Sequence, residues 1–204
     1  VSGPDAPEVT YQELDQEVIL YLSNDNPLSN NYLENYVAFH PKITRLLDDG
    51  TELDPLQRSY TLQGYQIYQT ANATVSPSQL NDIEVSRLVA TVDVKDSVDV
   101  VVNYILDQTM DLPVPVLVAD GPNEGIQHSF RLTNDAFAQG DSRLVNHKTY
   151  YYIVVAYGYN NYQEYNPVAR SGQAEQYKVS RRSGTGGAIR AVAVIPHKPT
   201  VENG

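Results

Sequence analysis

The chain of 204 residues contains no cysteine and no tryptophan, and it has a single methionine. The absence of cysteine excludes disulfide bonds, zinc knuckles and thiol catalysis. No apolar run approaches the roughly 20 residues that a membrane-spanning helix needs, so we expect no membrane insertion. Helical periodicity is almost absent as well, and this argues against a fold rich in helices.

Recognisable catalytic motifs are also missing. The sequence contains no G-x-S-x-G elbow, no H-E-x-x-H and no G-x-x-x-x-G-K loop. The histidines are far apart and none shows metal-ligand spacing, so we expect surface or strand residues and no metal site at His40, His128, His147 and His197. We predict that the protein is not an enzyme; the alternative is a glycoside hydrolase whose paired carboxylates are distant in sequence.

Charge is distributed unevenly along the chain, which has a net charge of −11. Residues 1–142 carry 6 Lys/Arg against 22 Asp/Glu, whereas residues 143–204 carry 8 against 3. One interpretation is that strands from the two parts interleave in the fold and the charged side chains lie on different solvent-facing surfaces. The other is that the basic residues form a patch that contacts an acidic neighbour or an anionic polymer. That patch would contain Arg170, Lys178, Arg181, Arg182 and Arg190. Nucleic acid is a poor partner for a chain this acidic overall.

What the sequence does contain is apolar alternation with period two, which is typical of strands. It occurs in residues 17–23, 60–70, 87–94, 98–105, 125–133, 144–156 and 188–195. In residues 60–70 the polar residues between the apolar ones include Gln63, Gln66 and Gln69. Lys95-Asp96-Ser97 has the length of a hairpin loop, which predicts that 87–94 pairs with 98–105. The pattern as a whole predicts an all-β fold, an antiparallel β-sandwich.

Other stretches interrupt this sandwich. Residues 23–58 are rich in Asn, Asp and Pro but hold several aromatic and aliphatic residues, so we expect a packed insertion. Residues 106–124 form a second insertion, in which Pro113 and Pro115 bar a central strand. Residues 133–140 are expected to form one capped helical turn. The Pro/Gly-rich ends predict linkers at 1–6 and 197–204 around one domain, 7–196, of a longer polypeptide.

Two acidic groups are candidate calcium sites. One is the loop with Asp48, Asp49, Glu52 and Asp54, and the other consists of Asp93, Asp96 and Asp99 near the expected hairpin. Neither has the twelve-residue pattern of a calcium loop, so solvated acidic turns are the favoured interpretation. We predict no cofactor, with Ca²⁺ as the alternative.

The stretch LVNHKTYYYIVVA (144–156) resembles the sixth strand of a fibronectin type III domain, and GYQIYQ (64–69) is similar to its third. The resemblance implies a fibronectin type III/immunoglobulin-like sandwich. It gives structural roles to Leu144, Tyr150, Tyr152, Val154 and Ala156, with Tyr150 as a tyrosine corner. The family domain is about half as long and usually has a core tryptophan. The longer phrases, from LVATVDVKDSVDVVVNYI to NHKTYYYIVVAYGYNNYQEYNP, resemble modules of large exported surface proteins of Bacteroidetes, which often use type IX secretion.

Residues 150–157 are apolar on both faces, whereas a strand with one solvated face alternates. The strand therefore needs cover on its odd-numbered side, from Tyr151 to Tyr157. We expect this cover from residues 23–58, and the alternative is a neighbouring module.

The loop GYNNYQEYNP (158–167) carries three further tyrosines, Tyr159, Tyr162 and Tyr165. Exposed tyrosines on a loop are common recognition residues, so they are candidate ligand contacts; alternatively, they are half-buried struts. The sequence predicts a non-catalytic structural or adhesive module of a larger secreted or cell-surface protein. Its partners would be neighbouring domains of the same polypeptide, or a glycan or surface protein. The alternative is a carbohydrate-binding accessory domain.

Overall fold

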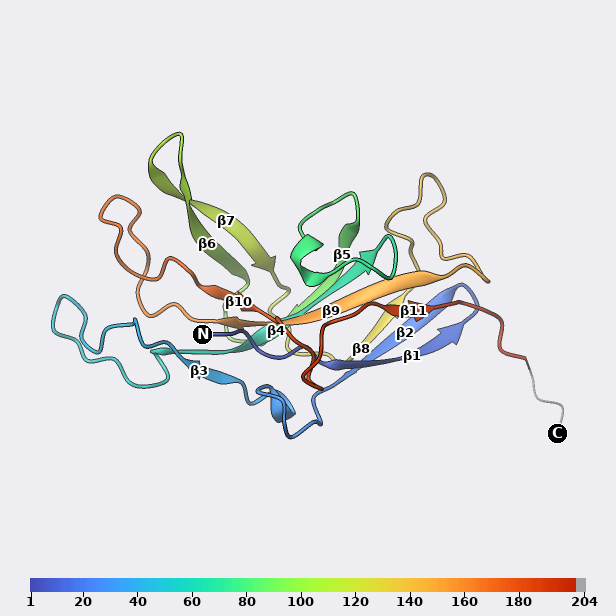
Figure 1. Cartoon of the computed structure of the whole chain (residues 1–204), viewed down its shortest axis with the longest axis horizontal. Coiled ribbons are helices and arrows are strands. Elements are labelled where there is room, and N and C mark those ends of the chain that lie inside the picture. The colour runs from blue at the N-terminus through green and yellow to red at the C-terminus, as the bar shows by residue number, and fades with distance from the viewer. Residues whose placement is uncertain (201–204) are drawn as a thin grey trace.

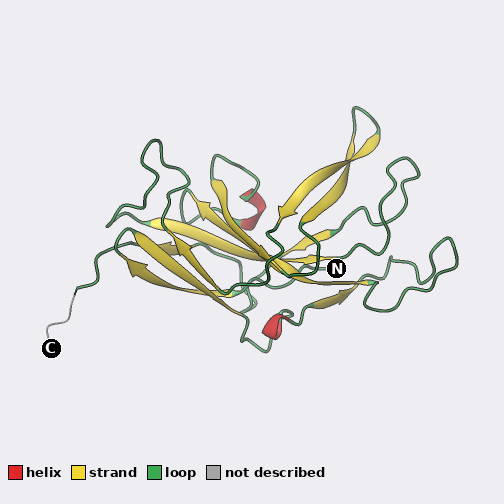
Figure 2. Ribbon diagram, turned by 180° about the vertical axis from the view of Figure 1, so that it is seen from behind, coloured by secondary structure: helices red, strands yellow, loops and turns green. Residues whose placement is uncertain are grey.

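The computed structural model describes residues 1–200 and is built almost entirely of strands (Figure 1, Figure 2). The strands are β1 (Glu8–Leu14), β2 (Glu17–Ser23), β3 (Val37–Phe39), β4 (Ser59–Thr70), β5 (Ser86–Asp93), β6 (Val100–Asp107), β7 (Leu112–Asp120), β8 (Ser129–Leu132), β9 (Tyr150–Tyr159), β10 (Tyr177–Val179) and β11 (Val192–Val194). Two short 3₁₀ turns, η1 (Tyr32–Glu34) and η2 (Pro77–Gln79), lie in loops. The predicted all-β class is confirmed.

The strands form three antiparallel sheets. One has the order β1-β2-β8, and a larger one has the order β10-β9-β4-β3. In the larger sheet β5 shares with β3 the side of β4 that faces away from β9, and β11 shares with β10 the other side of β9. The third is the two-stranded ribbon β6-β7, which projects from the body of the sandwich (Figure 1). The first two sheets pack face to face, so the predicted antiparallel sandwich is present.

The core between the two sheets follows from the alternation of β2, β4 and β9. Leu20 and Ile67 are completely buried there, and each contributes about 1.5–3 kcal/mol of transfer free energy. The remaining buried members of this cluster are Val18, Leu22, Tyr36, Tyr60, Leu62, Tyr65, Val92, Phe130, Leu144, Tyr150, Tyr152, Val154, Ala156 and Val194. The even-numbered residues of β9 therefore build the sandwich core.

The odd-numbered face of β9 is covered as well, but not by residues 23–58. Ile153 and Val155 pack in a second cluster with Ala6, Tyr68, Leu80 and Ile189, and Tyr157 packs with Val101 and Ala119 of the ribbon. The prediction failed because the 23–58 segment closes an end of the inner core instead. Tyr36 lies against Gly158, where a Cβ atom would come 2.7 Å from the Tyr36 ring.

The predicted hairpin between 87–94 and 98–105 is wrong. β5 pairs with β4, and β6 pairs with β7. The intervening turn is held from outside, because the Asn123 side-chain oxygen accepts hydrogen bonds from the amides of Asp96 and Ser97 at 2.9 and 3.1 Å. The 106–124 insertion thereby becomes the second strand of the ribbon. The helical turn predicted at 133–140 is also absent: Asp135 Oδ1 accepts a bond from the Phe137 amide, and the segment forms non-helical turns.

Both prolines of β7 lie on the outer edge of the ribbon. Tyr104 of β6 donates its amide to Ala174, away from β7, at 2.8 Å. In an antiparallel pair, the backbone amide and carbonyl groups of two directly opposite residues point either toward the partner strand or away from it, and both residues do the same. Pro115 lies directly opposite Tyr104. Pro115, and Pro113 two residues before it, therefore turn their nitrogens to the free edge, which agrees with the expectation that they bar a central strand.

The N-terminal residues are part of the folded domain, which corrects the linker predicted at 1–6. Asp5 is 2% exposed, and its carboxylate accepts two hydrogen bonds from Arg182, at 2.7 and 3.0 Å. The Asn30 amide donates a third, at 3.0 Å. Ala6 lies in the second cluster. At the other end, within the linker predicted at 197–204, the His197 amide bonds to the carbonyl of Leu14 at 3.0 Å, and residues 201–204 lie outside the described residues.

Candidate functional site

The residues given structural roles lie in β9 and in the loop before it. Leu144, Tyr150, Tyr152, Val154 and Ala156 are all buried in the inner core. The Tyr150 hydroxyl accepts a hydrogen bond from the Val145 amide at 2.8 Å, and Lys148 Nζ lies 4.9 Å from the centre of the Tyr150 ring. The ring thus ties the loop before β9 to the sandwich.

The three tyrosines predicted to lie on the loop are half-buried and are held by separate contacts. Only Tyr162 and Tyr165 lie on the loop, because Tyr159 is the last residue of β9 and pairs with Tyr177 of β10. Tyr165 packs on Tyr104 of the ribbon, with ring centres 4.6 Å apart, and Tyr159 packs against the cluster around Tyr157. Tyr162 is partly covered, and burial raises the pKa of its hydroxyl. Within residues 1–200 no two of these three rings stack on each other. Their contacts match the description of struts better than that of an open platform.

The candidate calcium residues 48–54 make separate contacts. Glu52 pairs with Arg45 at 2.6 Å, Asp49 accepts the Thr51 amide at 2.9 Å, and Asp54 accepts the Gln57 amide at 2.8 Å. Across the described residues no group of three or more His, Asp or Glu side chains is placed to hold a metal ion. No helix in this part of the chain has the length and apolarity needed to cross a membrane.

Asp93 is completely buried beneath the turn at Asp96. Its Oδ1 accepts the Asn123 amide at 2.7 Å, while Oδ2 has no hydrogen-bond partner within residues 1–200. Burial raises the pKa of the Asp93 carboxyl, and the nearby charges of Asp96 and Asp99 raise it further. The folded state therefore binds this proton more tightly than the unfolded state does.

This linkage gives a testable pH dependence. Because the native pKa of Asp93 is raised, its contribution to stability falls as pH rises from about 4, the ordinary pKa of the unfolded side chain, through the native value. Asp93→Asn removes the carboxyl group and with it this loss of stability. The melting temperature of the variant should therefore rise relative to that of the wild type as the pH increases from 4 to 7. Asp25→Asn is the control, because Asp25 is exposed and is not among the charges that act on Asp93. A difference that is constant with pH for Asp93→Asn would contradict the assignment.

Three buried glutamines of β4 hold neighbouring segments to the large sheet. Gln63 Nε2 donates to Asp96 Oδ1 at 3.1 Å, Gln66 Nε2 to the carbonyl of Val118 at 3.0 Å, and Gln69 Nε2 to Asp135 Oδ1 at 2.8 Å. Their sequence spacing of three does not follow strand alternation. The register against β9 shifts between Leu62 and Gly64, so Gln63 is an extra residue in β4, and this accounts for the spacing of Gln63 and Gln66. Gln69 lies opposite Tyr152, on the inner face of the strand.

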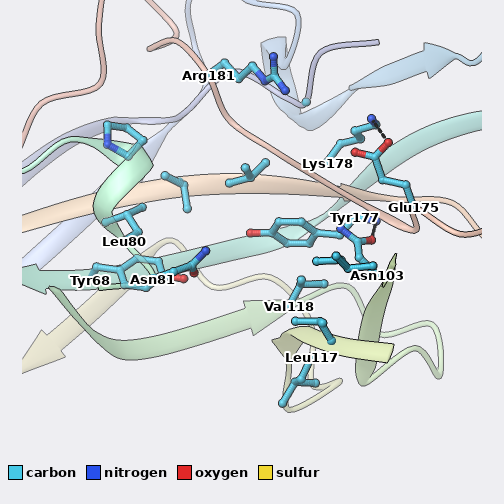
Figure 3. Close-up of a pocket in the computed structure, with 16 residues that line it drawn as sticks. Tyr68, Leu80, Asn81, Asn103, Leu117, Val118, Glu175, Tyr177, Lys178 and Arg181 are labelled. Atoms are coloured by element: carbon cyan, nitrogen blue, oxygen red, sulfur yellow. Dashed lines mark hydrogen bonds and ion pairs between the residues drawn. The ribbon is translucent and has the colours of Figure 1, made fainter. Parts of the chain in front are cut away.

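Between the ribbon and the outer face of the large sheet lies a cleft of about 570 Å³ (Figure 3). β9 and β10 contribute Val155 and Val179 to its lining, and the loop after η2 contributes Leu80. The ribbon contributes Ile105, Val116, Leu117 and Val118. Figure 3 shows the Tyr177 ring across the middle of the cleft, between Leu117 and Val118 on one side and Arg181 on the other. The lining is mostly apolar, which is typical of small-molecule sites.

The polar groups at the base of the cleft bond mainly to one another. The Tyr177 hydroxyl donates to Gln66 Oε1 at 2.7 Å, and burial raises the pKa of this hydroxyl, so it stays protonated. Asn103 Oδ1 accepts the amides of Gln176 and Tyr177 at 2.9 and 3.0 Å. These bonds fix the ribbon above β10, and they give the cleft a defined shape.

The proposed basic patch is largely neutralised within the chain. Lys178 pairs with Glu175 at 2.6 Å, Arg182 with Asp5 at 2.7 Å, and Arg170 with Asp111 at 3.2 Å. Arg181 and Arg190 are exposed and form no ion pair with any described residue. Arg181 lines the cleft, whereas Arg190 does not.

Sequence reasoning missed this cleft. It arises from the position of the ribbon, which depends on the unexpected pairing of β6 with β7. The available signal was the spacing of the three glutamines, because in a regular strand Gln66 points to the opposite face from Gln63 and Gln69. Comparisons with models of protein families, with curated protein sequences and with solved structures find no significant match.

Proposed function

We propose that the chain is a non-catalytic structural or adhesive module of a larger protein, in which the ribbon contacts a neighbouring domain of the same polypeptide. The ribbon carries this proposal because it holds large apolar side chains that are at least one third exposed. They are Val100, Ile105, Leu106, Met110, Leu112, Val116 and Leu117. Apolar groups gathered on a projecting element are typical of surfaces that are covered in an assembly.

A fibronectin type III-like ancestry is part of the proposal, and the strand order supports it. In immunoglobulin-type sandwiches the third strand lies beside the sixth, and the first two strands share a sheet with the fifth. Here β4 and β9, the candidate third and sixth strands, pair from Thr61 to Thr70, and β1, β2 and β8 form the other sheet. The bond between the Tyr150 hydroxyl and the Val145 amide also supports the proposal. Export to a bacterial cell surface is proposed on the resemblance of the longer phrases alone.

Hydrogen exchange tests the ribbon contact directly. Backbone amides of residues 104–116 should exchange more slowly in the full-length parent protein than in this isolated chain, because a neighbour covers the apolar side chains there. Amides in the middle of β9, already covered on both faces, should exchange alike in both samples and serve as the internal control. Equal exchange of residues 104–116 in the two proteins would overturn the proposed contact.

A further inference from the structure

The cleft beneath the ribbon has a lining that suits an apolar chain. Leu80, Val155, Val179 and Leu117 surround it on several sides, and its volume of about 570 Å³ lies within the range of small-molecule pockets. A second hollow of about 350 Å³ shares Tyr68, Leu80, Asn81, Leu117 and Val118 with it, and reaches Leu88 of β5. The two hollows therefore share a wall that is formed partly by β7.

The backbone of the surrounding elements is already engaged in hydrogen bonds. Gln66 bonds to the carbonyl of Val118, the Tyr104 amide bonds to Ala174, and β10 pairs with β9 along Tyr177–Val179. An extended peptide in the cleft would bring its own amides and carbonyls and find few partners, at a cost of about 1–3 kcal/mol for each unsatisfied group. A hydrocarbon chain brings no such groups. The cleft therefore favours an alkyl chain over a polypeptide.

The charges at the cleft specify the other end of the ligand. Lys178 is neutralised by Glu175, at 2.6 Å. Arg181 is exposed at the edge of the cleft and has no ion pair within residues 1–200, so it is the cation available to a ligand there. A guanidinium binds a carboxylate with two parallel hydrogen bonds. Charge complementarity thus calls for an anionic group beside Arg181.

We propose that this cleft binds an elongated alkyl carboxylate, with its hydrocarbon chain beneath the ribbon and its carboxylate on Arg181. The occupant is a free alkyl carboxylate and not a segment of a partner protein. This goes beyond a structural role, and it depends neither on the strand order nor on the exposed ribbon residues outside the cleft, such as Leu106 and Met110.

Titration calorimetry with sodium dodecanoate below its micelle concentration tests the proposal. We expect saturable binding of one dodecanoate per chain, and much weaker binding of dodecyltrimethylammonium, which has the same alkyl chain and the opposite charge. Arg181→Gln should weaken dodecanoate binding at least about tenfold, since a charge-assisted hydrogen bond contributes about 1.5–3 kcal/mol. The matched control is Arg190→Gln, at an exposed arginine outside the cleft, and it should bind like the wild type.

The apolar part of the site is tested by a second pair of variants. Leu117 lines the cleft and is 58% exposed, so Leu117→Asp should leave the fold intact and reduce dodecanoate binding at least tenfold. Leu106→Asp, at a ribbon position that is 48% exposed and does not line the cleft, should bind normally. Three results would overturn the proposal: no saturable binding of dodecanoate by the wild type, equal binding of dodecyltrimethylammonium, or unchanged binding by both Arg181→Gln and Leu117→Asp.

Discussion

Tyr150→Ala is expected to lower the free energy of unfolding by about 3–5 kcal/mol, the usual cost of removing a large aromatic ring from a core. The ring is 2% exposed and packs within the inner cluster between the two sheets. The substitution also removes the acceptor for the Val145 amide, which is partly buried. Since domains are stable by only about 5–15 kcal/mol, this is a large share of the total. Urea unfolding followed by circular dichroism measures it.

Two further variants separate the contributions at this position. Tyr150→Phe keeps the ring and loses only the hydroxyl, so it should cost about 1 kcal/mol. Tyr162→Ala removes a half-buried loop tyrosine and should cost less than about 1 kcal/mol, as is usual away from the core. If Tyr162→Ala destabilised the protein as much as Tyr150→Ala, the loop after β9 would be a core element, which would contradict this expectation.

Gly64→Ala is expected to cost about 3 kcal/mol, at the upper end for overpacking. A Cβ atom at Gly64 would overlap the carbonyl oxygen of Val92 and come within 3.0 Å of the Tyr157 ring. The Val92 oxygen belongs to backbone that is paired with β4, so it cannot rotate away as a side chain would. The adjacent strands must separate instead, which weakens the pairing that holds β5 and β9 to β4.

The matched control is Gly187→Ala. A Cβ atom there would meet only the Ser183 hydroxyl, at 3.8 Å, and the backbone conformation suits any residue. This variant should be as stable as the wild type or slightly more stable, because alanine reduces the freedom of the unfolded chain. Thermal melts of the two variants, read side by side, give the comparison. Similar melting temperatures for both would show that β4 and its neighbours accommodate the extra carbon.

The strands were predictable from sequence where local alternation decides the structure. β2, β4 and β9 place apolar residues at every second position, and the burial of one face enforces that pattern whatever the connections are. Alternation does not predict β1, because four of its seven residues are charged or polar and no residue of the strand is fully buried. It forms because the two-residue connection at Asp15-Gln16 brings it beside β2.

Strand pairing was harder to predict than strand position. Lys95-Asp96-Ser97 has the length of a hairpin loop, but the amides of Asp96 and Ser97 are bound by Asn123, which is distant in sequence. The cleft is hard to predict for the same reason, because the residues that line it are spread along the sequence from Gly3 to Arg181. Local patterns carry no information on such contacts. The exception is the spacing of Gln63, Gln66 and Gln69, which a regular strand with one wet face does not explain.

The two prolines on the outer edge of β7 have a consequence for solubility. An exposed strand edge usually recruits another strand through its free amides, and this is a common route to aggregation. Pro113 and Pro115 leave the first half of that edge without donors, so the ribbon displays apolar side chains and still resists extension by a third strand. A neighbour can cover the ribbon only by side-chain packing, and this separates productive contact from uncontrolled self-association.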